Sequence, residues 1–498
     1  MALALMGGCA LLPAPGPFPR QSPSASPTAS PATAAPALSY RELAEASVDT
    51  LLHGFYHNAG WRPCPLPDCR AVNRDWGVDS LTYTLYLRWQ TTHDAALVPY
   101  MTALASTAPL YPAPCHGIGG LLCTWSDAPQ WDVVAALREY EVTGKNTVAL
   151  DRAIRAFDTV EGSDVYTGGG CRDIRYQQPF GYLDRLKTLE TEATAVKAAL
   201  LLYRFTSSKR YLDIAIARYA RARRYYLDPT VPLYTVFVFD FDGKCRQVPR
   251  RFFASVNGEM ISNGLALFYF TGNRVYRRQA LATAAAVADR LNDARGIFAD
   301  LQADNDIVEP LVEAMYELAS REQLDFARSW LLRNAAAAAS ARKPDGTYGR
   351  FFDGPPPPGT VTAWQTNGAF ALMIVAAALE PDASPPPAAW THAQVVRHPV
   401  LVPSGTLRFT AAGIALIGTL GDPFLQPGHA RVFVDGVETF DRSGIWQGSS
   451  SALRRLPGSI LFAWQWPATK AHTLEFRPAA FNLKEGGAYL HVTSYLLK

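Results

Sequence analysis

The chain has 498 residues, of which 48% are hydrophobic and 18% charged, and its net charge at pH 7 is +3. This is the composition of an ordinary globular protein with room for two domains. The near balance of charge argues against a nucleic-acid partner, and no stretch after the first residues has the length and apolarity to cross a bilayer.

The first residues resemble the end of a bacterial lipoprotein signal. Small residues precede Cys9 as in a lipobox, although a positive region is missing and the apolar stretch is short. We interpret residues 1–9 as a signal remnant with Cys9 as the lipidation candidate; the alternative is a chance match. Residues 10–38 are rich in Pro, Ser and Ala, which cannot build a core and form a disordered tether. We therefore expect an exported protein, either a cell-surface lipoprotein or secreted, that meets a membrane only through this anchor.

From about residue 40 to 380 a helix–turn–helix phrase recurs, with clear copies at Thr143-Gly, Thr206-Ser and Thr271-Gly and looser ones at Thr92-His and Ser320-Arg. Each copy predicts two helices joined by a tight turn. The expected first helices are 79–91, 130–143, 189–206, 256–271, 306–320 and 361–379, and the second helices are 94–106, 146–160, 209–226, 274–292 and 322–341.

One further helix, expected at 41–56, has no partner in its own hairpin. It can pair with 361–379, which would close six hairpins into a ring without exposed terminal repeats. The pattern therefore predicts an all-α (α/α)6 toroid at 40–380. Beyond about 394, short runs of period two with turns such as Asp435-Gly436 predict a second, all-β sandwich domain at 395–498.

The links before the first helices are long, and long links in a compact domain are usually functional. In a ring of hairpins they all emerge at one end, which is where we expect the site. Apart from Cys9, the six cysteines lie in these links, and an even number in an exported protein favours disulfides. Pairing nearest neighbours gives Cys64–Cys69, Cys115–Cys123 and Cys171–Cys245. Metal binding is less favoured because no CxxC or His-rich spacing accompanies them.

Polar and aromatic side chains gather at the starts of the first helices. Carboxylates can move protons and stabilise an oxocarbenium-like state, and aromatic faces stack on sugar rings. About half of the acids suit helix capping instead, and Asp127-Ala-Pro-Gln130 has the form of a capping box. The candidate substrate-binding residues are Asp75, Trp76, Asp79, Trp125, Trp131, Glu192, Asn257, Glu259, Trp364 and Gln365.

Between about 40 and 380 the chain resembles the six-hairpin glycosidases, nearest to the α-1,6-mannanase-like enzymes of glycoside hydrolase family 76. The resemblance rests on Trp131-Asp-Val-Val-Ala-Ala-Leu-Arg-Glu-Tyr-Glu-Val-Thr-Gly144, on Gly168-Gly-Gly170, on Lys187-Thr-Leu-Glu-Thr-Glu and on Val256-Asn257-Gly258. It implies a retaining mechanism with adjacent aspartates at the start of the second inner helix. These positions fall on Asp127 and Ala128, so the second aspartate is absent and the nearest carboxylate is Asp132.

The leading hypothesis is an exported glycoside hydrolase-like protein that cleaves a polysaccharide, which the resemblance suggests is α-mannan. Asp127 would be the nucleophile or base, and Asp132 the acid, because burial raises the pKa of a carboxyl group. The alternative is a catalytically silent glycan-binding lipoprotein, which the loss at Ala128 favours. An epimerase or lyase is disfavoured because few histidines lie in the toroid. A monomer without cofactor or metal is expected, with a poly- or oligosaccharide as its partner.

Overall fold

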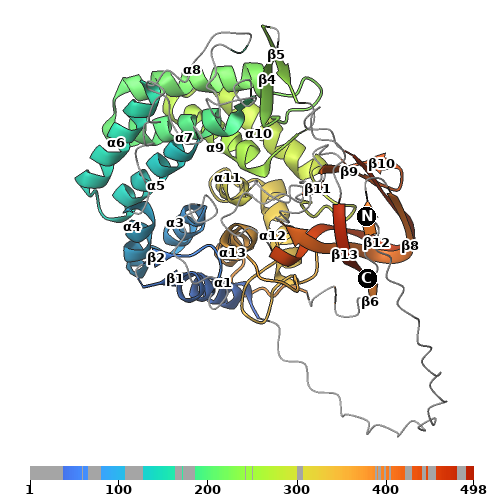
Figure 1. Ribbon diagram of the computed structural model, residues 1–498. Coiled ribbons are helices and arrows are strands. Elements are labelled where there is room, and N and C mark those ends of the chain that lie inside the picture. The colour runs from blue at the N-terminus through green and yellow to red at the C-terminus, as the bar shows by residue number, and fades with distance from the viewer. Residues whose placement is uncertain are drawn as a thin grey trace, which may run out of the picture. The chain divides into compact units, whose positions relative to one another are not determined.

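The structure is a computed structural model (Figure 1). It describes residues 38–58, 60–65, 80–106, 127–162, 171, 186–241, 243–248, 251–299, 307–386, 390, 394–396, 400–402, 405–420, 429–439, 445–446, 456–478 and 490–498. Structural statements below concern these residues. The signal remnant, the tether and Cys9 lie outside them.

Six helices surround the axis of the helical domain, and each is the first member of a predicted hairpin. Three of them, α7, α9 and α13, are buried along most of their length, as expected for helices covered on every side. Neighbours pack in the order α3, α5, α7, α9, α11, α13 and back to α3. Their bounds are α3 Leu81–Thr92, α5 Ala128–Val142, α7 Leu189–Thr206, α9 Ala254–Thr271, α11 Glu309–Ser320 and α13 Ala363–Leu379.

An outer layer of helices covers this ring and gives twelve α-helices among the described residues. The outer helices are α1 Tyr40–Asp49, α4 Val98–Ser106, α6 Thr147–Glu161, α8 Lys209–Tyr226, α10 Arg274–Arg290 and α12 Asp325–Ala339. None of these described helices combines the length and apolarity that a bilayer-spanning segment needs.

The first helix closes the ring, as predicted. α1 lies against α13 and continues into a short π-helix, Thr50–Gly54. The rings of Phe55 and Phe370 meet edge to face at 6.4 Å. The backbone N–H of Tyr40 donates to the carbonyl oxygen of Ala383 at 2.8 Å. The predicted (α/α)6 toroid is therefore confirmed.

The recurring Thr phrase has a physical basis in the hairpin turns. The hydroxyls of Thr143, Thr206 and Thr271 each donate to the carbonyl oxygen four residues earlier, at 2.6–2.7 Å. A residue with positive φ then ends the helix, as Gly272 does at φ 71°. Where an Asn follows, its side chain caps the next helix, as Asn273 does by accepting from the N–H of Val275 at 3.0 Å.

One link contains structure that the sequence pattern did not predict. Within 227–255, strands β4 (Phe237–Phe241) and β5 (Lys244–Gln247) form a hairpin, and β3 (Leu186–Thr188) adds to its edge. The predicted disulfide Cys171–Cys245 joins this hairpin to the preceding link, with sulfurs 2.04 Å apart. A two-stranded hairpin, β1 (Tyr56–His57) with β2 (Gly60–Trp61), follows α1.

Cysteine pairing can be checked in solution. Cys64 is also disulfide-bonded, while Cys69, Cys115 and Cys123 lie outside the described residues. If the six link cysteines all pair as predicted from the sequence, titration of the unfolded, unreduced protein should find at most one thiol. Reduction before titration is the control and should expose at least the six cysteines other than Cys9. Several thiols in the unreduced sample would contradict export into an oxidising compartment.

The C-terminal region is all β, as predicted. Its strands are β6 Gln394–Val396, β7 Val400–Val402, β8 Gly405–Leu420, β9 His429–Val434, β10 Val437–Glu438, β11 Ile445–Trp446, β12 Leu456–Pro478 and β13 Leu490–Leu497. The described strands form one antiparallel, hydrogen-bonded sheet with the main order β10-β9-β12-β8-β13-β6. β8 and β12 pair along most of their length through three register shifts, which change their direction without breaking the ladder.

Both faces of β8 are buried from Gly413 to Thr419, which accounts for the apolar run there. Ile414 and Leu416 pack within the β domain, while Ala415 and Ile417 on the opposite face belong to a cluster that includes Phe351 of the helical domain. The indole N–H of Trp390 donates to the carbonyl oxygen of Asp353 at 3.0 Å, and the amide of Gln465 also donates to this oxygen.

A buried acid pair lies where these parts meet. Asp353 is 1% exposed, and burial together with the charge of Asp293 raises the pKa of Asp353 well above its usual range. Because the folded pKa exceeds the unfolded one, the stabilising contribution is complete below the unfolded pKa and is lost as pH rises toward the folded value.

The pH dependence of stability should therefore change in Asp353→Asn. The amide can donate to Asp293 without binding a proton, so the variant should lose less stability than the wild type between about pH 5 and 8. Thermal melting of both proteins across this range measures the effect. Asp325→Asn, at the start of an outer helix, is the control. Parallel melting curves for Asp353→Asn and the wild type would show that Asp353 does not carry the proton.

Candidate functional site

The start of α5 carries the two predicted catalytic aspartates. Asp127 is the N-cap residue, with Pro129 in the first turn. The side chain of Asp127 makes no hydrogen bond to this first turn, so the capping box predicted from Asp127 and Gln130 does not form. Asp127 is half-buried as a residue, and one of its carboxylate oxygens is fully buried.

Helix geometry separates Asp127 from Asp132. With roughly 100° per residue, the two lie about 140° apart around α5, whereas Asp127, Trp131 and Arg138 share one stripe. Trp131 and Arg138 both contact Tyr83 of α3, at 5.6 Å between rings and 4.0 Å from guanidinium to ring, so this stripe faces the axis.

Asp132 instead shares its face with Glu139, seven residues on. Glu139 forms an ion pair with Arg152 of the outer helix α6, so this face of α5 is directed to the outer layer. Asp132 is 6% exposed. The assignment of Asp132 as the acid stays a prediction, but α5 does not bring it to the stripe that holds Asp127.

Glu259 of α9 shares a neighbour with Trp131, the side chain of Tyr83. Tyr83 donates its hydroxyl to one carboxylate oxygen of Glu259 at 2.8 Å, and Thr194 of α7 donates to the other at 2.9 Å. Burial raises the pKa of Glu259, although the charge of Lys197 opposes this shift. Tyr83 thus connects Trp131 and Glu259, two of the predicted site residues.

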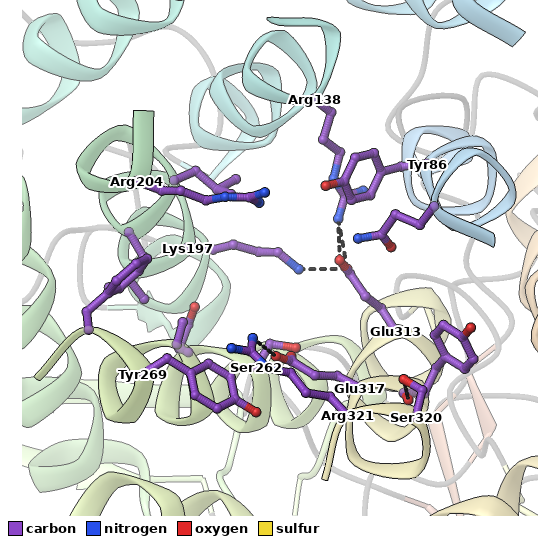
Figure 2. Close-up of a pocket in the computed structure, with 17 residues that line it drawn as sticks. Tyr86, Arg138, Lys197, Arg204, Ser262, Tyr269, Glu313, Glu317, Ser320 and Arg321 are labelled. Atoms are coloured by element: carbon purple, nitrogen blue, oxygen red, sulfur yellow. Dashed lines mark hydrogen bonds and ion pairs between the residues drawn. The ribbon is translucent and has the colours of Figure 1, made fainter. Parts of the chain in front are cut away.

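A buried ion cluster follows along the same axis (Figure 2). Both carboxylate oxygens of Glu313, on α11, accept from Arg138 at 2.8 and 2.9 Å, and one accepts from Lys197 at 2.8 Å. Burial alone would raise the pKa of Glu313, but the charges of Arg138 and Lys197 and their hydrogen bonds outweigh it and lower this pKa. Glu313, Arg138 and Lys197 therefore form a buried ion cluster, the ion plug, that connects the inner helices α11, α5 and α7.

One predicted binding residue, Glu192, forms an ion pair between the helix layers, and its binding role stays a prediction. Its carboxylate accepts from Arg218 of α8 at 2.8 Å, and both side chains are fully buried. Arg218 also pairs with Glu161 of α6 at 2.8 Å. This cluster fastens one inner helix to two outer ones, on the side of α7 away from the axis.

Three other predicted binding residues also serve local structure. The side-chain amide of Asn257 accepts from the N–H of Tyr234 and donates to its carbonyl oxygen, which fixes the preceding link to α9. Gln365 completes a capping box at the start of α13. Trp364 lies under the guanidinium of Arg350, 4.5 Å from the ring centre.

Part of the predicted site cannot be placed. Asp75, Trp76, Asp79 and Trp125 lie outside the described residues, and these positions stay predictions. Within the described ranges no group of three or more His, Cys, Asp or Glu could hold a metal ion.

The axial residues Tyr83, Thr194, Arg138, Lys197 and Glu313 were not among the predicted site residues. Two of them left a signal in the sequence. Arg138 and Lys197 interrupt apolar runs, Val-Val-Ala-Ala-Leu-Arg and Ala-Val-Lys-Ala-Ala-Leu, in helices expected to be buried. A charge within such a run requires a partner on a neighbouring helix.

Comparison with known proteins identifies the fold. No family model and no curated sequence matches the chain. A GH76A α-1,6-mannanase from Salegentibacter sp. HEL1_6 matches with a TM-score of 0.58 and 19% identity, over 68% of this chain and 100% of that one. A GH76 α-mannanase from Bacteroides thetaiotaomicron matches at 0.56 and 18%, over 68% and 96%.

A more distant match is Dfg5 from Chaetomium thermophilum, solved in complex with glucosamine, at a TM-score of 0.51 and 14% identity, over 71% and 92% of the two chains. An inactive variant of the Salegentibacter enzyme, with two consecutive aspartates replaced by alanine, was solved with α-1,6-mannotetrose. At these identities the matches establish a fold shared with glycoside hydrolase family 76, and the resemblance predicted from the sequence is confirmed at that level.

Proposed function

We propose that this protein is a glycoside hydrolase that binds α-mannan at the end of the toroid where α5 begins and cleaves its glycosidic bonds. The observation that carries the proposal is Asp127, which starts an inner helix, makes no capping bond to it and shares the axial stripe with Trp131. A carboxylate beside an aromatic face is the combination that sugar chemistry needs. The shared fold with α-1,6-mannanases supports the choice of sugar.

Cleavage requires a second carboxyl group. Ala128 stands where the family resemblance implies an aspartate. Asp132 is the candidate nearest in sequence, and Glu259 is the axial one, whose pKa is raised by burial, the direction that a general acid requires. We propose Glu259 as the second acid and treat Asp132 as its competitor. The hydroxyl of Tyr83, which bonds Glu259, holds that carboxyl group toward the Trp131 side.

A second candidate function is glycan binding without cleavage. Ala128 favours it, because an alanine cannot transfer a proton. In this case the stripe of Asp127 and Trp131 would hold the sugar and Glu259 would serve packing alone. The lipoprotein-like start of the chain suits either function, since a surface anchor would place the toroid next to external glycans.

Turnover of defined glycans tests the proposal. The full chain should release reducing ends from α-1,6-manno-oligosaccharides and α-mannan, with bacterial wall glycans and β-mannan as comparison substrates. Calorimetry on the same oligosaccharides measures binding separately. Binding without release would favour the second candidate, and neither binding nor release from any α-mannan would contradict the proposed substrate.

A further inference from the structure

A cavity of about 590 Å³ lies within the toroid on the far side of the ion plug. Its lining comes from the middle and C-terminal parts of five inner helices, α3, α5, α7, α9 and α11, and from Arg321 just after α11. Asp127 stands at the opposite end of α5, so the cavity faces the short turns of the hairpins and not the long links. Its volume lies in the range of small-molecule sites.

The lining carries more positive than negative charge. Four cations line it, Arg138, Lys197, Arg204 and Arg321, against the two carboxyl groups of Glu313 and Glu317. Glu313 is already bound by Arg138 and Lys197. Figure 2 shows the other two arginines on opposite sides of the open space, with Lys197 reaching in between them.

The two outer arginines are held in place but keep their charge accessible. Arg204 is 47% exposed and pairs with Glu141 at 2.5 Å. Arg321 is 58% exposed and its guanidinium lies 3.4 Å above the centre of the Tyr269 ring, with Glu317 at 3.7 Å. A guanidinium stacked on an aromatic ring presents its edge to a ligand with little loss of side-chain entropy.

Two buried polar atoms of the lining make no hydrogen bond to any described residue. They are the hydroxyl of Ser262 and one terminal nitrogen of Arg138, in residues 9% and 2% exposed. Buried polar groups normally have a partner, so these atoms offer a donor each to a bound molecule. Tyr86, Tyr269, Phe270 and Tyr316 supply ring surface around them.

We propose that this cavity is a second binding site, for a sugar-sized anion that carries a carboxylate or a phosphate. Arg204 and Arg321 would hold the anionic group, and the tyrosines would pack against the sugar ring. The inference does not depend on mannan hydrolysis, because it uses none of the residues at the Asp127 end.

The charge of Glu317 should make the affinity of this site for an anion depend on pH. Burial and the charge of Glu313 raise the pKa of Glu317 to about 7. When Glu317 ionises it adds a negative charge to the lining and opposes an incoming anion. The other charged groups around it are Glu313, Arg321, Glu322, Lys197, Arg204 and Arg138.

Calorimetry on the full chain tests the site with three kinds of probe: the uronic acids of mannose and glucose, the corresponding 6-phosphates, and the neutral sugars. At least one anionic probe should bind, and its neutral counterpart should bind at least about tenfold more weakly. Arg204→Gln and Arg321→Gln should each weaken the anion by about tenfold. Arg210→Gln is the matched control, since Arg210 is 55% exposed and ion-paired with Asp158 on the outer layer.

A change of pH separates binding in the cavity from binding elsewhere. For the uronic acids, which are fully ionised throughout this range, affinity should fall at least about threefold from pH 6 to 8 in the wild type and much less in Glu317→Gln. The 6-phosphates ionise a second time at about pH 6, so for them the wild type is compared with Glu317→Gln at each pH. Asp127→Asn should leave the affinity for the anion unchanged. Anion binding in the cavity and mannan cleavage at the Asp127 end are therefore tested independently of each other. Preference for the uronic acids or for the phosphates identifies the anionic group. The proposal would be overturned if none of the anions bound, or if Arg204→Gln and Arg321→Gln bound the anion as tightly as the wild type.

Discussion

Replacing Asp127 by asparagine should lower the rate of mannan cleavage by about 10²- to 10⁴-fold, because an amide of the same shape cannot ionise or move a proton. The fold should survive, since the Asp127 side chain makes no capping bond to α5, and asparagine is in any case an equivalent cap. Reducing-end release measures the rate, and thermal melting on the same samples confirms folding.

Parallel variants show which group is the partner of Asp127. Glu259→Gln should lose turnover to a similar extent while retaining oligosaccharide binding. Asp132→Asn should change stability and leave turnover of the folded protein largely intact, because its helix face is shared with Glu139 and directed to the outer layer. The reverse result, with Asp132→Asn inactive and fully stable, would restore Asp132 to the catalytic pair. Normal activity of Asp127→Asn would remove Asp127 from the chemistry altogether.

Glu313→Gln should be the most destabilising single substitution proposed here, by about 3–5 kcal/mol in the free energy of unfolding. It leaves the positive charges of Arg138 and Lys197, which are 2% and 9% exposed, without their shared carboxylate. Urea denaturation monitored by circular dichroism measures the loss.

Glu317→Gln is the matched control for this prediction. Glu317 stands one helical turn beyond Glu313, and its pKa of about 7 means that it is already partly neutral at neutral pH. Its replacement should cost less than about 1 kcal/mol. Equal effects of the two substitutions would show that the two cations do not depend on Glu313 for compensation.

The helical fold was predictable because its signals are local. The 3.6-residue period of apolar residues and the Thr-containing turn motif both lie within each hairpin. The helices expected at 189–206 and 209–226 have the same bounds as α7 and α8. The hairpin of β4 and β5 was missed although Asp242-Gly243 between its strands is a local turn signal. Its pairing with β3 and its disulfide to Cys171 could not be predicted in the same way, because both partners are far away in sequence.

The site was less predictable because the function of a charged side chain depends on its partner. Glu192 and Glu259 lie near the starts of neighbouring inner helices and look alike in the sequence. Glu192 is directed outward to Arg218, and Glu259 inward to Tyr83. The partners stand 26 and 176 residues away, respectively. Only the arrangement of the helices separates an ion pair between layers, as at Glu192, from a carboxyl group on the axis, as at Glu259.

Closure of the ring by α1 has a consequence during synthesis. The helix is among the first parts of the domain to leave the ribosome, yet it packs on α13, which ends at Leu379. At roughly 5–20 residues per second, α1 waits for tens of seconds with its apolar stripe of Tyr40, Leu43 and Ala44 uncovered. The ring can be completed only after nearly the whole domain has been made, so holding this helix soluble in the meantime falls to its polar face or to a chaperone.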